Sequence, residues 1–356
     1  MMGISWSEIW YSSLAFLIFL VVSRLFFFND YKRRLSPAFS SQIVSFFIVL
    51  IALFFASEPI ILYSDKWLYQ KDFYRISNGM MFEIKDAGFY FYTKLISLVT
   101  GSSEIYFFLT ALLYLTGFYI FAVQKIDSKY RLLLFLAFVS GMGFYSYGNN
   151  TIRAGLALSL FLVVMSRPYL FNFSTLVMLV IVLALHKSLL LPLAALLISL
   201  IYRRSDHFFT LWMVCLLLSL FAGEGFVGLF GEFFSFADAR VTEYTTTTVE
   251  NYKTGFRWDF VLFSLFPILL AKYYMKQKYK DPLYSQLLSM YIISNAFWLL
   301  LIRMPFSDRM ATLSWFLIPV LIMYPLLTKR IFEKQHFWIA GVLLVNMLIT
   351  FTLNMK

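Results

Sequence analysis

Arginines and carboxylates at the ends of apolar segments are the side chains in this sequence best suited to chemistry. Arg153 follows the polar residues "NNT" and opens a long apolar run. "GFRWDF" carries Arg257 and Asp259, and "RMPFSDRM" carries Arg303 and Arg309. A guanidinium matches phosphate oxygens two at a time, and a helix N-terminus adds partial positive charge. These arginines therefore predict a diphosphate site, whereas the alternative is plain anchoring at lipid headgroups, with Asp259 merely neutralising Arg257.

Three further residues are candidates for a general base. Asp65 stands in "YSDKWLYQKDFY", Asp86 in "EIKDAGFYF" and His186 in "LALHKSLLLP". A positioned carboxylate or imidazole can take a proton from an attacking hydroxyl. We rank Asp65 first, followed by His186 and Asp86. Each also has a structural alternative, because Asp65 can be solvated, Asp86 can cap the helix that follows it, and His186 can be a structural interfacial residue.

Aromatic and polar residues near the same segment ends are candidates for binding a sugar. Aromatic residues make up 21% of the chain, and most of them should face lipid or form interfacial belts. The predicted substrate-binding residues are Asn150, Tyr69, Tyr147, Trp258, Asp259 and Tyr244. The three histidines, at 186, 207 and 336, are too scattered for a metal centre, and no Gly-rich phosphate loop follows a strand. We expect no metal and no cofactor.

The elements that position these residues are membrane-spanning helices. The chain is 61% hydrophobic and 14% charged, against about 25% charged residues in soluble domains. Apolar stretches of about 20 residues cross a bilayer. The sequence predicts an all-α polytopic transmembrane bundle that forms a single domain over 1–356. Its predicted spans, about twelve, are 9–28, 43–62, 103–123, 131–147, 152–167, 169–185, 188–202, 208–223, 257–275, 283–302, 309–327 and 337–353.

The distribution of charge predicts the orientation of the chain. The net charge is +11, and one alternating set of loops holds 16 Lys and Arg against 5 acidic residues. These loops are 29–36, 124–131, 166–169, 202–207, 272–281 and 328–335. Because basic loops stay in the cytoplasm, we place all candidate site residues and both termini outside. The basic excess then needs no nucleic acid, and a working face outside the cytoplasm has no easy access to ATP or nucleotide sugars.

Two long outer connections, 63–102 and 224–256, are predicted to cap an extracytoplasmic cavity. The stretch 87–99 is apolar but too short to span, so it should form an interfacial or half-inserted helix. In 225–240, Phe226, Phe230, Phe233 and Phe234 share one helical face, which predicts a second interfacial helix.

The order of these motifs resembles the EpsG-like, Wzy-type polysaccharide polymerases. "NNTIRAGLALSLFL" resembles their Asn-x-Ile-Arg signature. "DKWLY", "KDAGFYFYTKLI", "HKS", "GFRWDF" and "SDRM" resemble further family elements in the same order over about 65–310. Two positions depart from the pattern: Ala154 replaces a frequent Gln, and Asp86-Ala87-Gly88 replaces Glu-Pro-Gly.

The resemblance implies a fold like that of C-type membrane glycosyltransferases, in a bacterial inner membrane. It also implies a metal-independent polymerase that joins undecaprenyl-diphosphate-linked O-antigen or capsule repeat units on the periplasmic face. The implied partners are the lipid-linked glycan donor and acceptor, the bilayer and a chain-length regulator. The arginines would stabilise the leaving diphosphate. The alternatives are a lipid-linked oligosaccharide flippase and a membrane acyltransferase acting on exported polysaccharide.

Overall fold

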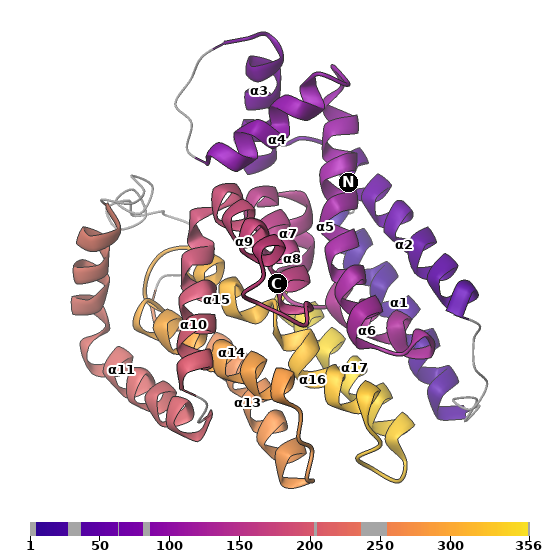
Figure 1. Cartoon of the computed structure of the whole chain (residues 1–356), viewed down its shortest axis with the longest axis vertical. Helices are drawn as coiled ribbons and strands as arrows, with labels where there is room; N and C mark the ends of the chain where they lie inside the picture. The colour runs from indigo at the N-terminus through magenta and orange to yellow at the C-terminus, as the bar shows by residue number, and fades with distance from the viewer. Residues whose placement is uncertain are drawn as a thin grey trace. The chain divides into compact units, whose positions relative to one another are not determined.

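The computed structural model describes residues 5–27, 37–62, 64–80, 86–202, 205–235 and 255–354 (Figure 1). Throughout these residues the regular structure is helical, without a strand, which confirms the predicted all-α class. The chain divides into two compact units, Met1–Leu190 with Leu326–Lys356, and Leu191–Pro325.

The first unit consists of the N-terminal helices and the last helix of the chain. Its elements are α1 (Trp6–Phe27), α2 (Pro37–Ser57), α3 (Asp65–Ser77), α4 (Ala87–Ser97), α5 (Ser103–Lys125), η2 (Ser128–Tyr130), α6 (Arg131–Val139), α7 (Phe144–Asn149), α8 (Ile152–Met165), α9 (Phe173–Leu185), η3 (Lys187–Leu189) and α17 (Gln335–Asn354). Within it α5 packs between α2 and α8, α1 packs on α17, and α8 packs on α9.

The second unit is formed by the helices between them. Its elements are α10 (Leu190–Ile201), α11 (Ser205–Ser235), α13 (Trp258–Lys276), α14 (Pro282–Leu300), α15 (Ser307–Trp315) and α16 (Ile318–Thr328). A buried polar network around Asn295 of α14 joins four of them. The Asn295 amide accepts from the Trp212 indole at 2.7 Å and donates to Ser264 and Ser314 at 3.2 and 2.9 Å. Every hydrogen-bonding atom of this buried amide therefore has a partner.

Eight helices in the described residues are long and apolar enough to cross a membrane. They are Trp6–Phe27, Phe39–Ser57, Ser103–Lys125, Ser205–Gly223, Trp258–Lys276, Pro282–Leu300, Ser307–Thr328 and Gln335–Asn354, so that α15 and α16 together form one candidate span. The other four predicted spans contain shorter helices. The longest single helix among them, α8, has 14 residues, or about 21 Å, against a hydrocarbon core of about 30 Å. The total of twelve therefore stays a prediction.

Local sequence explains why one of these predicted spans is divided. The stretch 131–147 is broken between α6 and α7 at Gly143, whose φ of 81° lies in the left-handed region that glycine adopts without strain. The short α7 then folds back on the start of α8, where Gly155 takes part in the contact. A Cβ atom at Gly155 would stand 2.0 Å from the Tyr147 carbonyl oxygen. Glycine at 155 thus permits the turn that precedes Arg153.

Both long connections contain helix. The predicted helix over 87–99 is present as α4, which with 11 residues is too short to span. Helices α3 and α4 lie beside each other near the N-terminal end of α5 (Figure 1). In the second connection the helix α11 continues to Ser235 beyond a kink at Ala222, where φ is −128° and ψ is 18°. The rest of the predicted 225–240 helix lies outside the described residues.

Candidate functional site at the ends of α3, α4, α8 and α9

A buried lysine fastens α3 to its neighbours in the first unit. The Lys66 ammonium donates to the backbone oxygens of Phe55 and Glu58 at 2.7 and 3.0 Å, and to the Asn149 Oδ1 atom at 2.9 Å. The residue is 4% exposed. Burial lowers the pKa of Lys66 to about 8, and the nearby Glu58 carboxylate opposes this shift. α3 is not one of the candidate spans.

The partners of Lys66 are themselves connected. The Glu58 carboxylate accepts from the Tyr145 hydroxyl at 2.6 Å and from the Asn149 amide. The Lys66 backbone N–H donates to the Asn150 Oδ1 atom at 3.3 Å. The "NN" lead-in therefore ties the end of α2, the start of α3 and the end of α7 together, and this fixes the position from which α8 begins.

Arg153 is the second residue of α8 and forms an ion pair with Asp86. Its Nη1 atom lies 2.8 Å from the Asp86 Oδ2 atom, with exposed side-chain fractions of 13% and 5%. Its Nε atom donates to the Tyr69 hydroxyl at 3.2 Å, and its guanidinium carbon lies 5.4 Å from the Tyr69 ring centroid. The predicted residues Tyr69, Asp86 and Arg153 thus come together from three different helices.

His186 approaches the same carboxylate from the end of α9. Its Nδ1 atom lies 3.5 Å from the Asp86 Oδ2 atom, and its Nε2 atom lies 3.2 Å from the Ser188 hydroxyl. Asp86 occupies the N-cap position of α4 but makes no side-chain cap hydrogen bond. The capping alternative for Asp86 is therefore wrong, because its carboxylate contacts two cation-forming side chains instead. A buried carboxylate between a guanidinium and an imidazole can stabilise positive charge on either one.

The first unit contains three more of the predicted site residues, Asp65, Tyr147 and Asn150. Asp65 is the first residue of α3, is half-buried, and precedes Tyr69 by one helical turn. Tyr147 is buried in α7 with 6% of its surface exposed, so its ring packs within the protein in this structure. Asn150 contributes to the α3 anchor described above.

The residues of "GFRWDF" lie in the second unit. Arg257 forms a two-point ion pair with Asp259, with Nε–Oδ1 and Nη2–Oδ2 distances of 2.9 and 2.7 Å. The Arg257 guanidinium carbon also lies 3.6 Å from the Phe260 ring centroid. Trp258 is 55% exposed at the start of α13, and its ring lies against that of Phe256. In this structure Asp259 neutralises Arg257, as the structural alternative predicts.

Arg303 contacts the helix break in α11. Its Nε and Nη2 atoms donate to the backbone oxygens of Ser219 and Leu220 at 3.4 and 3.3 Å, just before the kink at Ala222. A Cβ atom at Gly223 would stand 2.7 Å from the Arg303 Nε atom, so the glycine admits the guanidinium. These contacts give Arg303 a structural role.

The two remaining predicted residues complete the set. Arg309 is the third residue of α15, and its guanidinium carbon lies 5.1 Å from the Phe306 ring centroid. Tyr244 lies outside the described residues.

Comparison with known proteins gives a single result. The sequence model of the EpsG family matches residues 62–356, which include α3, α4, α8 and α9. The chain belongs to the EpsG family. No curated protein and no solved structure gives a match. The predicted EpsG resemblance is therefore confirmed, and the chain is an EpsG-family multi-pass membrane protein.

Sequence reasoning missed three residues of this candidate site. Lys66 stands beside Asp65 in the segment "DKWLY", and nothing in the sequence distinguishes it from a solvated lysine. Glu58 follows α2 directly, and none of the sequence motifs includes it. Ser188 was visible only as part of "HKS", and its contact with His186 depends on the turn of η3.

Proposed function

We propose that this EpsG-family protein is a Wzy-type polysaccharide polymerase. It joins undecaprenyl-diphosphate-linked repeat units at the outer face of a bacterial inner membrane, without a metal. The observation that carries the proposal is the cluster of Arg153, Asp86 and His186, in which an anion-binding group and a proton-accepting group share one buried carboxylate. Transfer of a glycosyl group from a lipid diphosphate requires both functions.

Arg153 would bind the diphosphate of the donor. As the bond from the anomeric carbon to the diphosphate oxygen breaks, its electron pair leaves on that oxygen, and the charge there increases. A guanidinium fixed by Tyr69 stabilises this charge without reorganisation, as an oxyanion hole does. Because arginine can contact two oxygens at once, lysine is a poor substitute.

His186 would take the proton of the attacking hydroxyl. The acceptor oxygen forms the new bond to the anomeric carbon while its proton passes to the imidazole, and Asp86 then stabilises the imidazolium. The contact with Asp86 favours His186 over Asp65, our first choice from sequence. Asp65 remains the alternative base, because it begins the helix that carries Tyr69.

The proposed sidedness follows from the basic loops. Asp86 stands in the connection 63–102 between two candidate spans, and the contacts of Arg153 and His186 with Asp86 support the same outer side for all three residues. Arg153 and His186 stand between the four shorter segments, so the proposal requires these segments to reach the outer face.

Acyl transfer to exported polysaccharide is a second candidate function, and one specific observation favours it. The Ser188 hydroxyl, the His186 imidazole and the Asp86 carboxylate form a chain with contacts of 3.2 and 3.5 Å. A hydroxyl that contacts an imidazole supported by a carboxylate is the arrangement that activates a serine nucleophile. In that reaction Ser188 would carry the acyl group.

The test is polymerisation by the purified protein in lipid nanodiscs, supplied with lipid-linked repeat units and a metal chelator. We expect a ladder of longer lipid-linked chains on a gel. Arg153→Lys should lower the rate about 10- to 100-fold, which corresponds to one charge-assisted hydrogen bond. The matched control is Arg167→Lys, because Arg167 contacts Ser174 at the far end of α8. Unextended substrate with the wild-type protein, or equal rates for both variants, would refute the proposal.

A further inference from the structure

A pocket opens at the end of the first unit opposite the Arg153 cluster. All its lining residues belong to this unit, and its volume is about 680 Å³. They include Asp127 and Lys129, which follow the end of α5, whereas Gln70 of α3 donates to Ser103 at its beginning. α5 has 23 residues, or roughly 34 Å, so the pocket and the cluster are separated by the length of a membrane span.

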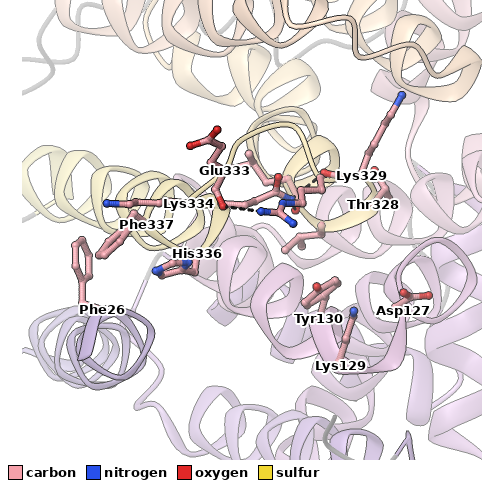
Figure 2. A pocket seen from close by; sticks show the side chains of 14 residues that line it. Phe26, Asp127, Lys129, Tyr130, Thr328, Lys329, Glu333, Lys334, His336 and Phe337 are labelled. Atoms are coloured by element: carbon pink, nitrogen blue, oxygen red, sulfur yellow. Dashed lines mark hydrogen bonds between the residues drawn. The ribbon is translucent and has the colours of Figure 1, made fainter. Parts of the chain in front are cut away.

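The pocket is lined by cations whose charge is not neutralised within the described part of the chain. Lys129 and Arg330 form no ion pair there: the Lys129 ammonium lies 4.4 Å from the Tyr130 ring centroid, and the Arg330 Nη2 atom donates to the Glu333 backbone oxygen at 3.2 Å. The two walls of the pocket are the segments 127–130 and 326–337. Figure 2 shows the Lys129 ammonium extending into the space between these walls, and the Glu333 carboxylate is turned away from that space. Four Lys and Arg side chains line the pocket against the two carboxylates of Asp127 and Glu333, so its net charge favours an anion.

Hydrogen bonds fix both walls of the pocket. Gln335 donates to the backbone oxygen of Lys329 at 2.8 Å and accepts from the backbone N–H groups of Ile331 and Phe332 at 2.6 and 3.3 Å. On the other wall the Ser40 hydroxyl donates to the Ser128 backbone oxygen at 2.6 Å and holds η2 against α2. The cations are therefore presented by a preformed frame, and binding requires little ordering of the chain.

One side of the pocket is apolar and belongs to helices that cross the membrane. Phe26 at the end of α1 and Phe337 at the start of α17 have ring centroids 4.8 Å apart (Figure 2). Phe26 is 43% exposed. Next to them Phe332 and Trp338 stack at 4.4 Å, and Trp and Tyr side chains favour the level of the lipid headgroups. Cations beside an apolar wall at this level match a phosphate that carries hydrocarbon chains.

We propose that this pocket binds the phosphate of an anionic phospholipid, with Lys129 and Arg330 on the phosphate oxygens and an acyl chain along Phe26 and Phe337. Basic pockets at the ends of membrane helices are suited to such headgroups. A free phosphate or diphosphate shares the charge of the ligand but lacks the chain that the apolar wall fits. This site is independent of the proposed polymerase activity, because no residue of the Arg153 cluster takes part in it.

Native mass spectrometry of the full chain, released from nanodiscs with equal phosphatidylglycerol and phosphatidylcholine, tests the proposal. We expect phosphatidylglycerol to stay bound to the wild type and to fall about tenfold in Lys129→Gln/Arg330→Gln, because each surface cation near an anionic headgroup adds to the attraction. The matched control is Lys276→Gln/Lys280→Gln, which removes the same charge from exposed residues of the basic loop 272–281 that do not line the pocket. This control should keep the lipid.

Three outcomes would overturn the proposal. Equal loss in both double variants would mean general surface attraction, and equal retention would mean that the pocket is not the site. Displacement of phosphatidylglycerol by millimolar inorganic phosphate or pyrophosphate would assign the pocket to a free anion. Should the double variant fail to fold, Lys129→Gln alone decides the question, because the Lys129 ammonium lies over the adjacent Tyr130 ring and forms no hydrogen bond or ion pair among the described residues.

Discussion

Gly88 of α4 lies against Ala184 of α9 so closely that a Cβ atom at position 88 would stand 2.7 Å from the Ala184 carbonyl carbon. Asp86 lies two residues before Gly88, and His186 lies two residues after Ala184. The close approach of the two helices therefore sets the contact between this carboxylate and this imidazole. Gly88 therefore does not contact the cluster itself, but it sets the spacing of the two helices whose ends carry Asp86 and His186.

Gly88→Ala should push α4 away from α9 and separate Asp86 from His186. We expect a loss of about 1–3 kcal/mol in the free energy of unfolding, typical of an overpacked contact, and a marked fall in polymerisation rate. The control is Gly101→Ala, because no atom lies within 4 Å of a Cβ built at Gly101. Equal behaviour of the two variants in denaturant titration and in the ladder assay would contradict this explanation.

The Asp86–Arg153 ion pair should appear as a coupling energy. Removing either partner leaves a nearly buried charge behind, so Asp86→Asn and Arg153→Met should each lower the free energy of unfolding by about 2–4 kcal/mol. The double variant should lose less than the sum, with a coupling of about 0.5–3 kcal/mol. Denaturant titration in detergent of the wild type, the two single variants and the double variant measures this coupling energy. Strict additivity of the losses would show that the pair is not energetically coupled.

Ser188→Ala distinguishes the two candidate functions. If His186 acts as a base on the substrate hydroxyl, the alanine variant should keep most of the activity, because Ser188 only contacts the imidazole. If Ser188 carries an acyl group, the same change should abolish turnover and any covalent adduct. We expect a ladder within about tenfold of the wild type, as is usual for loss of one neutral hydrogen bond. A complete loss together with a serine adduct in the wild type, seen by mass spectrometry, would favour acyl transfer.

Lys66 should make stability rise with pH in the alkaline range. The pKa of Lys66 falls from 10.5 to about 8 on folding, so between these values the unfolded chain binds more protons than the folded one. Stability therefore increases with pH there, whereas below about pH 8 the contribution of Lys66 does not change with pH, because both states are protonated. Wild type should gain about 3 kcal/mol relative to Lys66→Met between pH 8 and 10.5.

The exposed neighbour Lys71 provides the control for this titration. Its ammonium lies over the Trp67 ring, and Lys71→Met should reproduce the slope of the wild type. Parallel stability curves for wild type and Lys66→Met would show that burial does not perturb the ammonium.

The sequence predicted the helical class and much of the cluster, for identifiable reasons. Long apolar runs leave few alternatives to a membrane helix, and the polar residues at the ends of these runs include Asp86, Arg153 and His186. The partnerships were less predictable. Capping of α4 was the structural alternative for Asp86, because this residue precedes the helix in the chain, and only the tertiary contact between α4 and α9 brings it to His186.

Span number and buried charge were harder to predict from sequence. An apolar run gives the same signal whether it is one long helix or two short ones, and the break before α7 depends on a single left-handed glycine, Gly143. Lys66 looks like any other loop lysine until the three oxygens that receive it are placed around it. Such clusters combine residues from distant segments, so the pattern of residues along the sequence does not predict which of them will be partners.

The contact of Arg303 with the kink in α11 has a consequence for biosynthesis. Arg303 follows Ser219 by 84 residues, so at about 5–20 residues per second it leaves the ribosome roughly 4–17 s after the helix that it supports. During that interval the two backbone oxygens before the kink lack the guanidinium, and a straight helix would satisfy them better within the membrane. The bend in α11 is therefore expected to form late, after the chain has been inserted.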